Sequence, residues 1–158
     1  MQIGKYSFGI GDRFAHQGEA QLKALIQASE ALGFEIVPVW NKSNREHLIV
    51  HSTPADTRRA ADAAVKALKY ESRYFVDADH INLGNVDKFI DASDFFTLDV
   101  ADYIGKKASQ ADVDAFVAVN MKYTGKLQIP GIAAPFDVSK ELLQQIAEKF
   151  LYAVQEAG

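Results

Sequence analysis

The segment YFVDADHINL, residues 74–83, is the part of the sequence on which the fold prediction depends most. It begins with the apolar side chains of a buried strand and ends with two carboxylates and an imidazole, those of Asp77, Asp79 and His80. Carboxylates at the end of a buried strand are costly to desolvate unless a partner neutralises them. The segment therefore predicts either a turn with capping residues or a polar site for a metal ion or a substrate.

Outward from this segment, the chain alternates strand-like and helix-like stretches. Strands are predicted at residues 5–10, 34–40, 73–79 and 94–100, and helices at 17–32, from Thr53 onward, and at 85–92. Residues 41–47, NKSNREH, are interpreted as a polar loop. Nearly continuous apolar strands that alternate with helices are typical of a parallel sheet covered by helices.

The pattern changes after the fourth strand. Residues 116–133 predict two short strands joined near 123–126, and a last helix is predicted at 139–155. The apolar face of that helix is expected to bury Leu142, Ile146, Phe150 and Val154. The expected fold class is α/β, as half of a (β/α)8 TIM-type barrel with four βα units and a hairpin insertion after strand 4. A small open α/β sheet is the alternative, and residues 1–158 are expected to form one domain with strand order 1-2-3-4.

Composition narrows the function classes. The formal charge is −4, and no Lys/Arg-rich run is present, so nucleic acid is not expected as a partner. The absence of cysteine excludes disulfides and thiolate chemistry. No apolar run approaches the roughly 20 residues needed to span a bilayer, and the N-terminus lacks the pattern of a signal peptide. A cytoplasmic protein without a membrane partner is expected.

Polar residues follow each predicted strand. They are Asp12 and Arg13 after the first strand, Asn41 and Arg45 after the second, Asp79 and His80 after the third, and Asp99 and Asp102 after the fourth. Ligands of parallel α/β proteins bind at the carboxyl edge of the sheet, where these clusters would meet. The alternatives are that Asp12, Asp99 and Asp102 cap helices and that residues 41–47 form a solvated loop.

Two further features near these clusters have competing interpretations. Gly9 and Gly11 resemble half of a phosphate-binding loop, but the full GxGxxG pattern is absent, and tight-turn glycines are the alternative. Asp79 and His80 are predicted metal ligands, because carboxylate oxygen with imidazole nitrogen suits a divalent ion such as Zn, Mn, Co, Ni or Fe(II).

Three motifs at successive strand ends together suggest a family. FGIGDRF (8–14), DADHINL (77–83) and FFTLDVADYI (95–104), in this order, resemble the tagaturonate epimerase family of hexuronate metabolism. The resemblance implies a metal-dependent (β/α)8-barrel epimerase that interconverts tagaturonate and fructuronate. The positions that match the family are Asp12, Arg13, Asp79, His80, Asp99 and Asp102.

The resemblance also implies partners and roles. Family members are longer, so this chain would be an N-terminal half that needs either a second copy or the missing C-terminal barrel half. A sugar acid would be cleaved and rejoined by retro-aldol chemistry, with Asp12 or Asp102 as acid/base. Arg13 or Arg45 would bind the substrate carboxylate, beside Asn41 and Asp99. The alternatives are another metal-dependent sugar isomerase or aldolase, and a non-catalytic barrel half that acts as an assembly module.

Overall fold

The computed structural model describes residues 2–158. The chain divides into two compact units, Met1–Asp99 and Val100–Gly158. The single domain predicted over residues 1–158 stays a prediction. Between residues 2 and 158, no helix combines the length and the apolar character that crossing a membrane would require.

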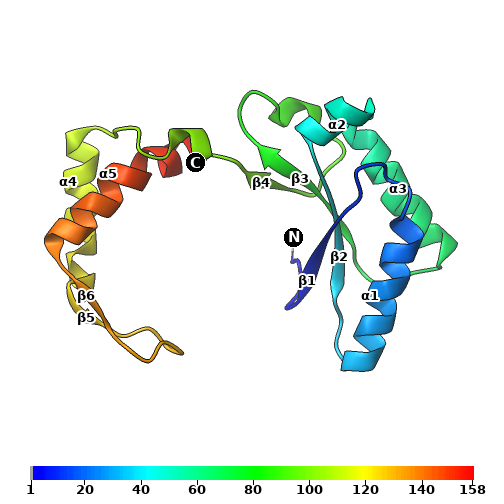
Figure 1. The fold of residues 1–158 in the computed structure, drawn as a ribbon, viewed down its shortest axis with the longest axis horizontal. Coiled ribbons are helices and arrows are strands. Elements are labelled where there is room, and N and C mark those ends of the chain that lie inside the picture. The colour runs from blue at the N-terminus through cyan, green and yellow to red at the C-terminus, as the bar shows by residue number, and fades with distance from the viewer. Residues whose placement is uncertain (1) are drawn as a thin grey trace. The chain divides into compact units, whose positions relative to one another are not determined.

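A four-stranded parallel sheet forms the centre of the first unit. Its strands are β1 (Ser7–Gly11), β2 (Val37–Ser43), β3 (Phe75–Ile81) and β4 (Phe95–Leu98). Neighbouring strands pair in the order β1-β2-β3-β4, and all three pairings are parallel (Figure 1). The structure therefore confirms the α/β class and the predicted strand order.

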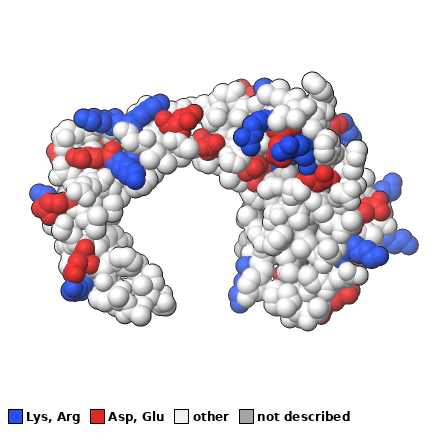
Figure 2. All heavy atoms as spheres, in the orientation of Figure 1, with Lys and Arg blue, Asp and Glu red and all other residues white. Residues whose placement is uncertain are grey.

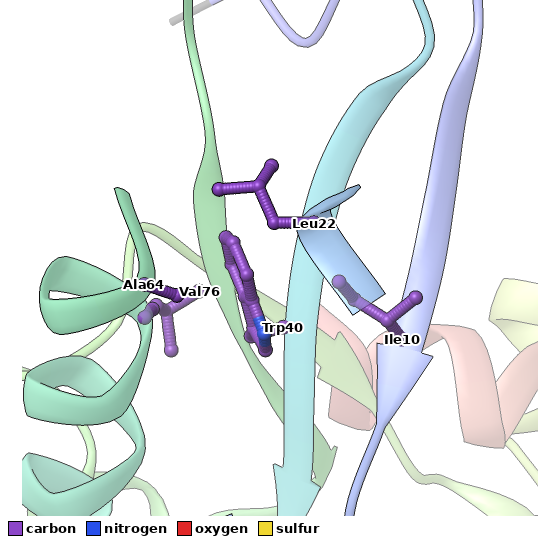
Figure 3. Close-up of a cluster of buried hydrophobic side chains, with 6 residues drawn as sticks. Ile10, Leu22, Trp40, Ala64 and Val76 are labelled. Carbon is purple, nitrogen blue, oxygen red and sulfur yellow. The ribbon is translucent and has the colours of Figure 1, made fainter. Parts of the chain in front are cut away.

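Helices α1 (Gly18–Leu32) and α3 (Pro54–Ala67) cover one face of this sheet. Ile10, Trp40 and Val76 are register neighbours on β1, β2 and β3, and they pack with Leu22 and Ala64 from the two helices (Figure 3). Side chains alternate between the faces of a strand, so the residues that follow these three lie on the opposite face. That row consists of Gly11, Asn41, Asp77 and, on β4, Phe95.

The predicted loop at 41–47 is wrong. β2 continues to Ser43, and Asn44–Val50 forms helix α2. Ser43 and Glu46 form a capping box, in which the Glu46 N–H donates to Ser43 Oγ at 3.3 Å and the Ser43 N–H donates to Glu46 Oε2 at 3.1 Å. The S-x-x-E spacing of this motif indicates a helix start, so the signal was present in the sequence.

The predicted helix at 85–92 is also wrong, since only Val86–Lys88 form a short 3-10 helix. Asn side chains compete for the backbone there: the Asn82 N–H donates to Asn85 Oδ1 at 2.9 Å, and the Gly84 N–H donates to Asn82 Oδ1 at 2.9 Å. Such local bonds favour turns over a regular helix.

The second unit contains α4 (Gln110–Asn120), β5 (Gly125–Leu127), β6 (Phe136–Val138) and α5 (Lys140–Ala157). β5 and β6 form an antiparallel hairpin, as predicted, but its strands lie later in the chain than expected. Most of the segment predicted as the first of these strands belongs instead to α4, whose Ser109 cap accepts the N–H of Asp112 at 3.1 Å.

Helix α5 is where the sequence predicted it, but its buried face is different. Leu143 and Ala147 pack against Val113 and Val117 of α4. The predicted core residues lie on another face of the helix and are 37 to 63% exposed: Leu142, Ile146, Phe150 and Val154. The helix has two apolar stripes, and packing selected the one that contains the smaller Ala147.

Candidate active site

A cavity of about 340 Å³ lies at the carboxyl ends of β2, β3 and β4. Its lining comes from three strand ends, namely Ser43, Asn44 and Arg45, then His80 and Asn85, then Asp99. Acidic and basic side chains gather at the end of the first unit where α2 lies (Figure 2). The predicted residues Arg45, His80 and Asp99 therefore meet at one edge of the sheet.

The backbone of His80 has an unusual conformation. Its φ of 56° is in the left-handed region, which is costly for a residue with a side chain. The pairing of β3 with β4 changes register between Ala78 and Ile81, and the Asn85 side chain donates to the His80 carbonyl at 3.3 Å. The strand thus continues to Ile81, beyond its predicted end at residue 79, and its irregularity places the imidazole in the cavity lining.

The His80 imidazole lies between two carboxylates. Its Nε2 is 3.7 Å from Asp79 Oδ2, and its Nδ1 is 3.2 Å from Asp99 Oδ2. Two ligands of one tetrahedral ion, each about 2.1 Å from it, would be separated by about 3.4 Å. The Asp79–His80 spacing is close to this value, and a carboxylate on the other ring nitrogen is the usual support for a metal-bound histidine.

The described residues do not form a complete metal centre. Between residues 2 and 158, no group of three or more His, Cys, Asp or Glu side chains is arranged to hold a metal ion. Catalytic zinc sites use three protein ligands and an open position. Asp79 and His80 would therefore supply two ligands, and further ligands would have to come from outside the described residues.

Asp77, which the sequence analysis did not assign, is buried on the same face of β3 as Asp79. It is 6% exposed, and its Oδ2 accepts a hydrogen bond from Thr97 Oγ1 at 2.7 Å. Its Oδ1 has no hydrogen-bond partner among residues 2–158. Burial raises the pKa of Asp77 above its ordinary value, against the opposing hydrogen bond from Thr97. The period-2 alternation of D-A-D was the signal that could have placed it beside Asp79.

The side chain of Asn41, on β2, lies against Gly9 and Gly11 of the neighbouring strand β1. A Cβ added at Gly11 would lie 3.0 Å from Asn41 Oδ1, whereas one at Gly9 would lie 3.5 Å from Asn41 Nδ2. These glycines lie within β1 or at its end and have ordinary negative φ values, so they are neither a phosphate loop nor a tight turn. The close approach of the Asn41 side-chain amide explains why residues without a Cβ stand at these two positions.

We expect Gly11→Ala to displace the Asn41 side chain, while Gly9→Ala leaves it in place. A 3.0 Å contact requires the amide to rotate, at a cost of about 1 kcal/mol, whereas 3.5 Å is ordinary packing. The side-chain NH2 resonances of Asn41 in a ¹⁵N-labelled sample report this directly. Unchanged Asn41 resonances in Gly11→Ala would show that the glycine serves another purpose.

Asp12 and Arg13 lie at the carboxyl end of β1. Asp12 accepts backbone N–H groups of Phe14 at 3.1 Å and of His16 and Gln17 at 2.6 Å each. Burial acts to raise the pKa of Asp12, but these amides hold it below its ordinary value. Its carboxylate thus stabilises the turn that precedes α1, whose first residue is Gly18, and its catalytic role stays a prediction.

Two other predicted site residues, Arg13 and Asp102, do not line the cavity. The Arg13 Nε is 3.9 Å from Glu46 Oε1 of α2, and Arg13 is not part of the cavity lining. Asp102 lies in a short 3-10 helix of the second unit, Ala101–Tyr103, so its catalytic role stays a prediction.

A buried polar network that the sequence pattern does not predict supports α2. Lys42 Nζ donates to Ser52 Oγ at 2.9 Å, and His47 Nδ1 lies 2.9 Å from the same oxygen. Lys42 and His47 are 3% and 4% exposed. Burial lowers the pKa of Lys42, and it lowers the pKa of His47 to about 4. The unprotonated Nδ1 of a neutral His47 can accept a hydrogen bond from the Ser52 hydroxyl, and this network holds α2 against the end of β2.

Comparisons with known proteins identify the family. The family model described as tagaturonate epimerase matches residues 1–150. Among solved structures, the glycerol-complexed fructuronate-tagaturonate epimerase UxaE from Cohnella laeviribosi is similar, with TM-score 0.69 and 20% identity over 95% of this chain. Its native structure gives TM-score 0.68 and 22% identity.

The chain spans 32% of the length of each of these two structures. At this identity they show likeness of fold, and no match is found among curated proteins. The family and its structural neighbours are epimerases, which are isomerases acting on carbohydrates. Because the family model matches nearly the whole sequence, the chain belongs to the tagaturonate epimerase family.

Proposed function

We propose that this chain takes part in the interconversion of tagaturonate and fructuronate, and that the cavity at the ends of β2, β3 and β4 binds the keto-hexuronate. The observation that supports this most is the alignment of Asp79, His80 and Asp99, with separations of 3.7 and 3.2 Å. In this proposal the sheet is the first half of a (β/α)8 barrel in a cytoplasmic enzyme. A second copy or the missing C-terminal barrel half would complete the barrel.

Asp79 and His80 are proposed as two ligands of a divalent metal ion, with Asp99 fixing the orientation of the imidazole through Nδ1. When bound, such an ion supplies Lewis-acid stabilisation of negative charge on the substrate oxygens. We assign Asp99 to positioning in place of direct substrate contact, because its Oδ2 is 3.2 Å from Nδ1. The candidate ions are Zn, Mn, Co, Ni and Fe, and metal titration can distinguish among them.

The proposed chemistry is a retro-aldol cleavage followed by re-addition. A base removes the proton of the hydroxyl on the carbon two positions from the ketone carbon, and that carbon becomes an aldehyde. The bond between it and the carbon next to the ketone breaks, and the electron pair of this bond forms an enediolate. The aldehyde fragment rotates, the enediolate attacks its other face, and the proton returns to the new alkoxide. Arg45 in the cavity lining would bind the substrate carboxylate. Asn41 is not part of that lining and stays a predicted substrate contact. Asp12 or Asp102 would act as the acid/base, and the Asp12 carboxylate already accepts three backbone N–H groups.

His80→Asn tests this proposal, since asparagine tolerates the left-handed backbone of residue 80. We expect affinity for Mn²⁺ or Zn²⁺, measured by isothermal titration calorimetry, to fall at least 100-fold, an order-of-magnitude expectation. Asp99→Ala should lower it by about 10- to 100-fold. Thermal stability of His80→Asn should change little, because His80 is exposed.

His51→Asn is the matched control, because His51 is also exposed, has a φ of 54° and is not part of the cavity lining. The substrate is tested by following tagaturonate conversion to fructuronate beside other ketoses, with and without the metal. Equal metal affinity in the unsubstituted chain and His80→Asn would show that His80 is not a metal ligand. Faster turnover of another ketose would favour a different sugar isomerase or aldolase.

A further inference from the structure

Beneath the carboxyl ends of β1 and β2 lies a second, much smaller cavity, of about 10 Å³. Its lining includes Gln21 of α1, Trp40 of β2 and Thr57 of α3, together with Asp12 and Asn41. It is therefore separate from the larger cavity, and α1, β2 and α3 meet around it.

Three buried polar atoms in residues that line this cavity lack a hydrogen-bond partner within the described chain. They are Gln21 Oε1, Trp40 Nε1 and Thr57 Oγ1. Leaving any of these atoms unpaired would lower the stability of the folded chain, because its desolvation cost would not be offset by a hydrogen bond. Gathering three such atoms around one cavity is not expected of ordinary apolar packing.

The donors and acceptors of these atoms match one molecule. Gln21 Nε2 donates to the Gly11 carbonyl at 3.1 Å, which leaves Oε1 as an acceptor. The Trp40 Nε1–H is a donor, and the Thr57 hydroxyl can accept. A water molecule would accept from Trp40 and donate to Gln21 and Thr57, and three bonds are usual for a buried water.

We propose that this cavity is a binding site for one ordered water molecule. A volume of roughly 10 Å³ is the lower limit for a single water, and the site is polar enough to hold it. The water joins α1 and α3 to β2, and through the Gln21–Gly11 hydrogen bond it also holds the end of β1. The water thus helps to fix the end of β1, which Asp12 directly follows.

Gly18 provides a variant that fills the site. A Cβ at this position would lie 3.8 Å from Trp40 Nε1 and 3.3 Å from the Ala64 Cβ. Gly18→Ala therefore places a methyl group beside the indole nitrogen, where it competes with the water. Thr57→Ser is the matched control, because it keeps the hydroxyl group and removes only a methyl group.

A crystal structure of the unsubstituted chain, at a resolution that shows ordered waters, is the direct test. We expect a water peak within about 2.7 to 3.2 Å of all three polar atoms. The peak should persist in Thr57→Ser and be absent in Gly18→Ala. An empty cavity in the unsubstituted chain, or side chains rotated to pair with one another, would overturn the proposal even if Gly18→Ala failed to fold.

A solution measurement uses the fact that the sequence has one tryptophan. The Trp40 Nε1–H resonance is therefore unambiguous, and it should show a cross-peak to water with the sign of a long-lived contact. Gly18→Ala should remove the cross-peak, whereas Thr57→Ser should keep it. A cross-peak that is absent from the unsubstituted chain, or unchanged in Gly18→Ala, would contradict the site.

Discussion

Phe89→Ala is expected to lower the free energy of unfolding by about 3 to 5 kcal/mol. The Phe89 side chain is 2% exposed and packs on Ala78 and Ile81 of β3. Its ring also lies 5.7 Å from the His47 ring of α2. Alanine would leave a cavity beneath the strand that carries Asp79 and His80, so urea denaturation followed by circular dichroism should show a lower midpoint.

Ile90 is the matched control for this substitution. It is the next residue along the chain, but it is 54% exposed, so Ile90→Ala should change the free energy of unfolding by well under about 1 kcal/mol. Phe89→Leu should have an intermediate effect because it removes less volume. Equal midpoints for Phe89→Ala and Ile90→Ala would show that Phe89 is not part of a closely packed core.

Stability is expected to fall as the pH drops from about 6.5 to about 4 because of His47. Burial lowers the pKa of His47 to about 4 in the folded chain, from an ordinary value of 6.5. Between these values the unfolded chain binds more protons than the folded one, so each fall in pH favours unfolding. The full contribution of this residue is about 3 kcal/mol, present above pH 6.5 and lost toward pH 4.

His47→Asn isolates this contribution from that of the carboxylates. Asparagine cannot take up the proton, so the difference in unfolding free energy between pH 7 and pH 4.5 should shrink by about 2 to 3 kcal/mol. His51→Asn, at an exposed position, should retain the pH dependence of the unsubstituted chain. A His47→Asn variant with that same pH dependence would mean that burial and the nearby charge of Lys42 do not hold His47 neutral.

The sheet could be predicted from the sequence because apolar runs and helical spacing are strong signals. The same reasoning brought His80 and Asp99 together, although they are 19 residues apart, since ends of neighbouring parallel strands meet at one edge. The left-handed backbone at His80 could not be predicted, because it follows from a change of register between β3 and β4.

Other errors have distinct physical causes. The polar run at 41–47 is typical of a solvated loop, yet Ser52 pairs with Lys42 and His47 and allows both to be buried. In α5, two apolar stripes compete, and only the contacts with α4 decide that Leu143 and Ala147 face inward. Helical spacing alone cannot choose between such stripes.

The order β1-β2-β3-β4 also has a consequence for how the chain folds during synthesis. In this sheet β2, β3 and β4 each pair with the strand made just before them, so none of the three must wait for a partner that is made later. As translation proceeds, each new βα segment can add to the growing edge and cover it while the next segment is still being made. Pairings between consecutive strands keep sequence separations shorter than pairings between distant strands would. The sheet can therefore assemble in the direction of translation, from β1 to β4.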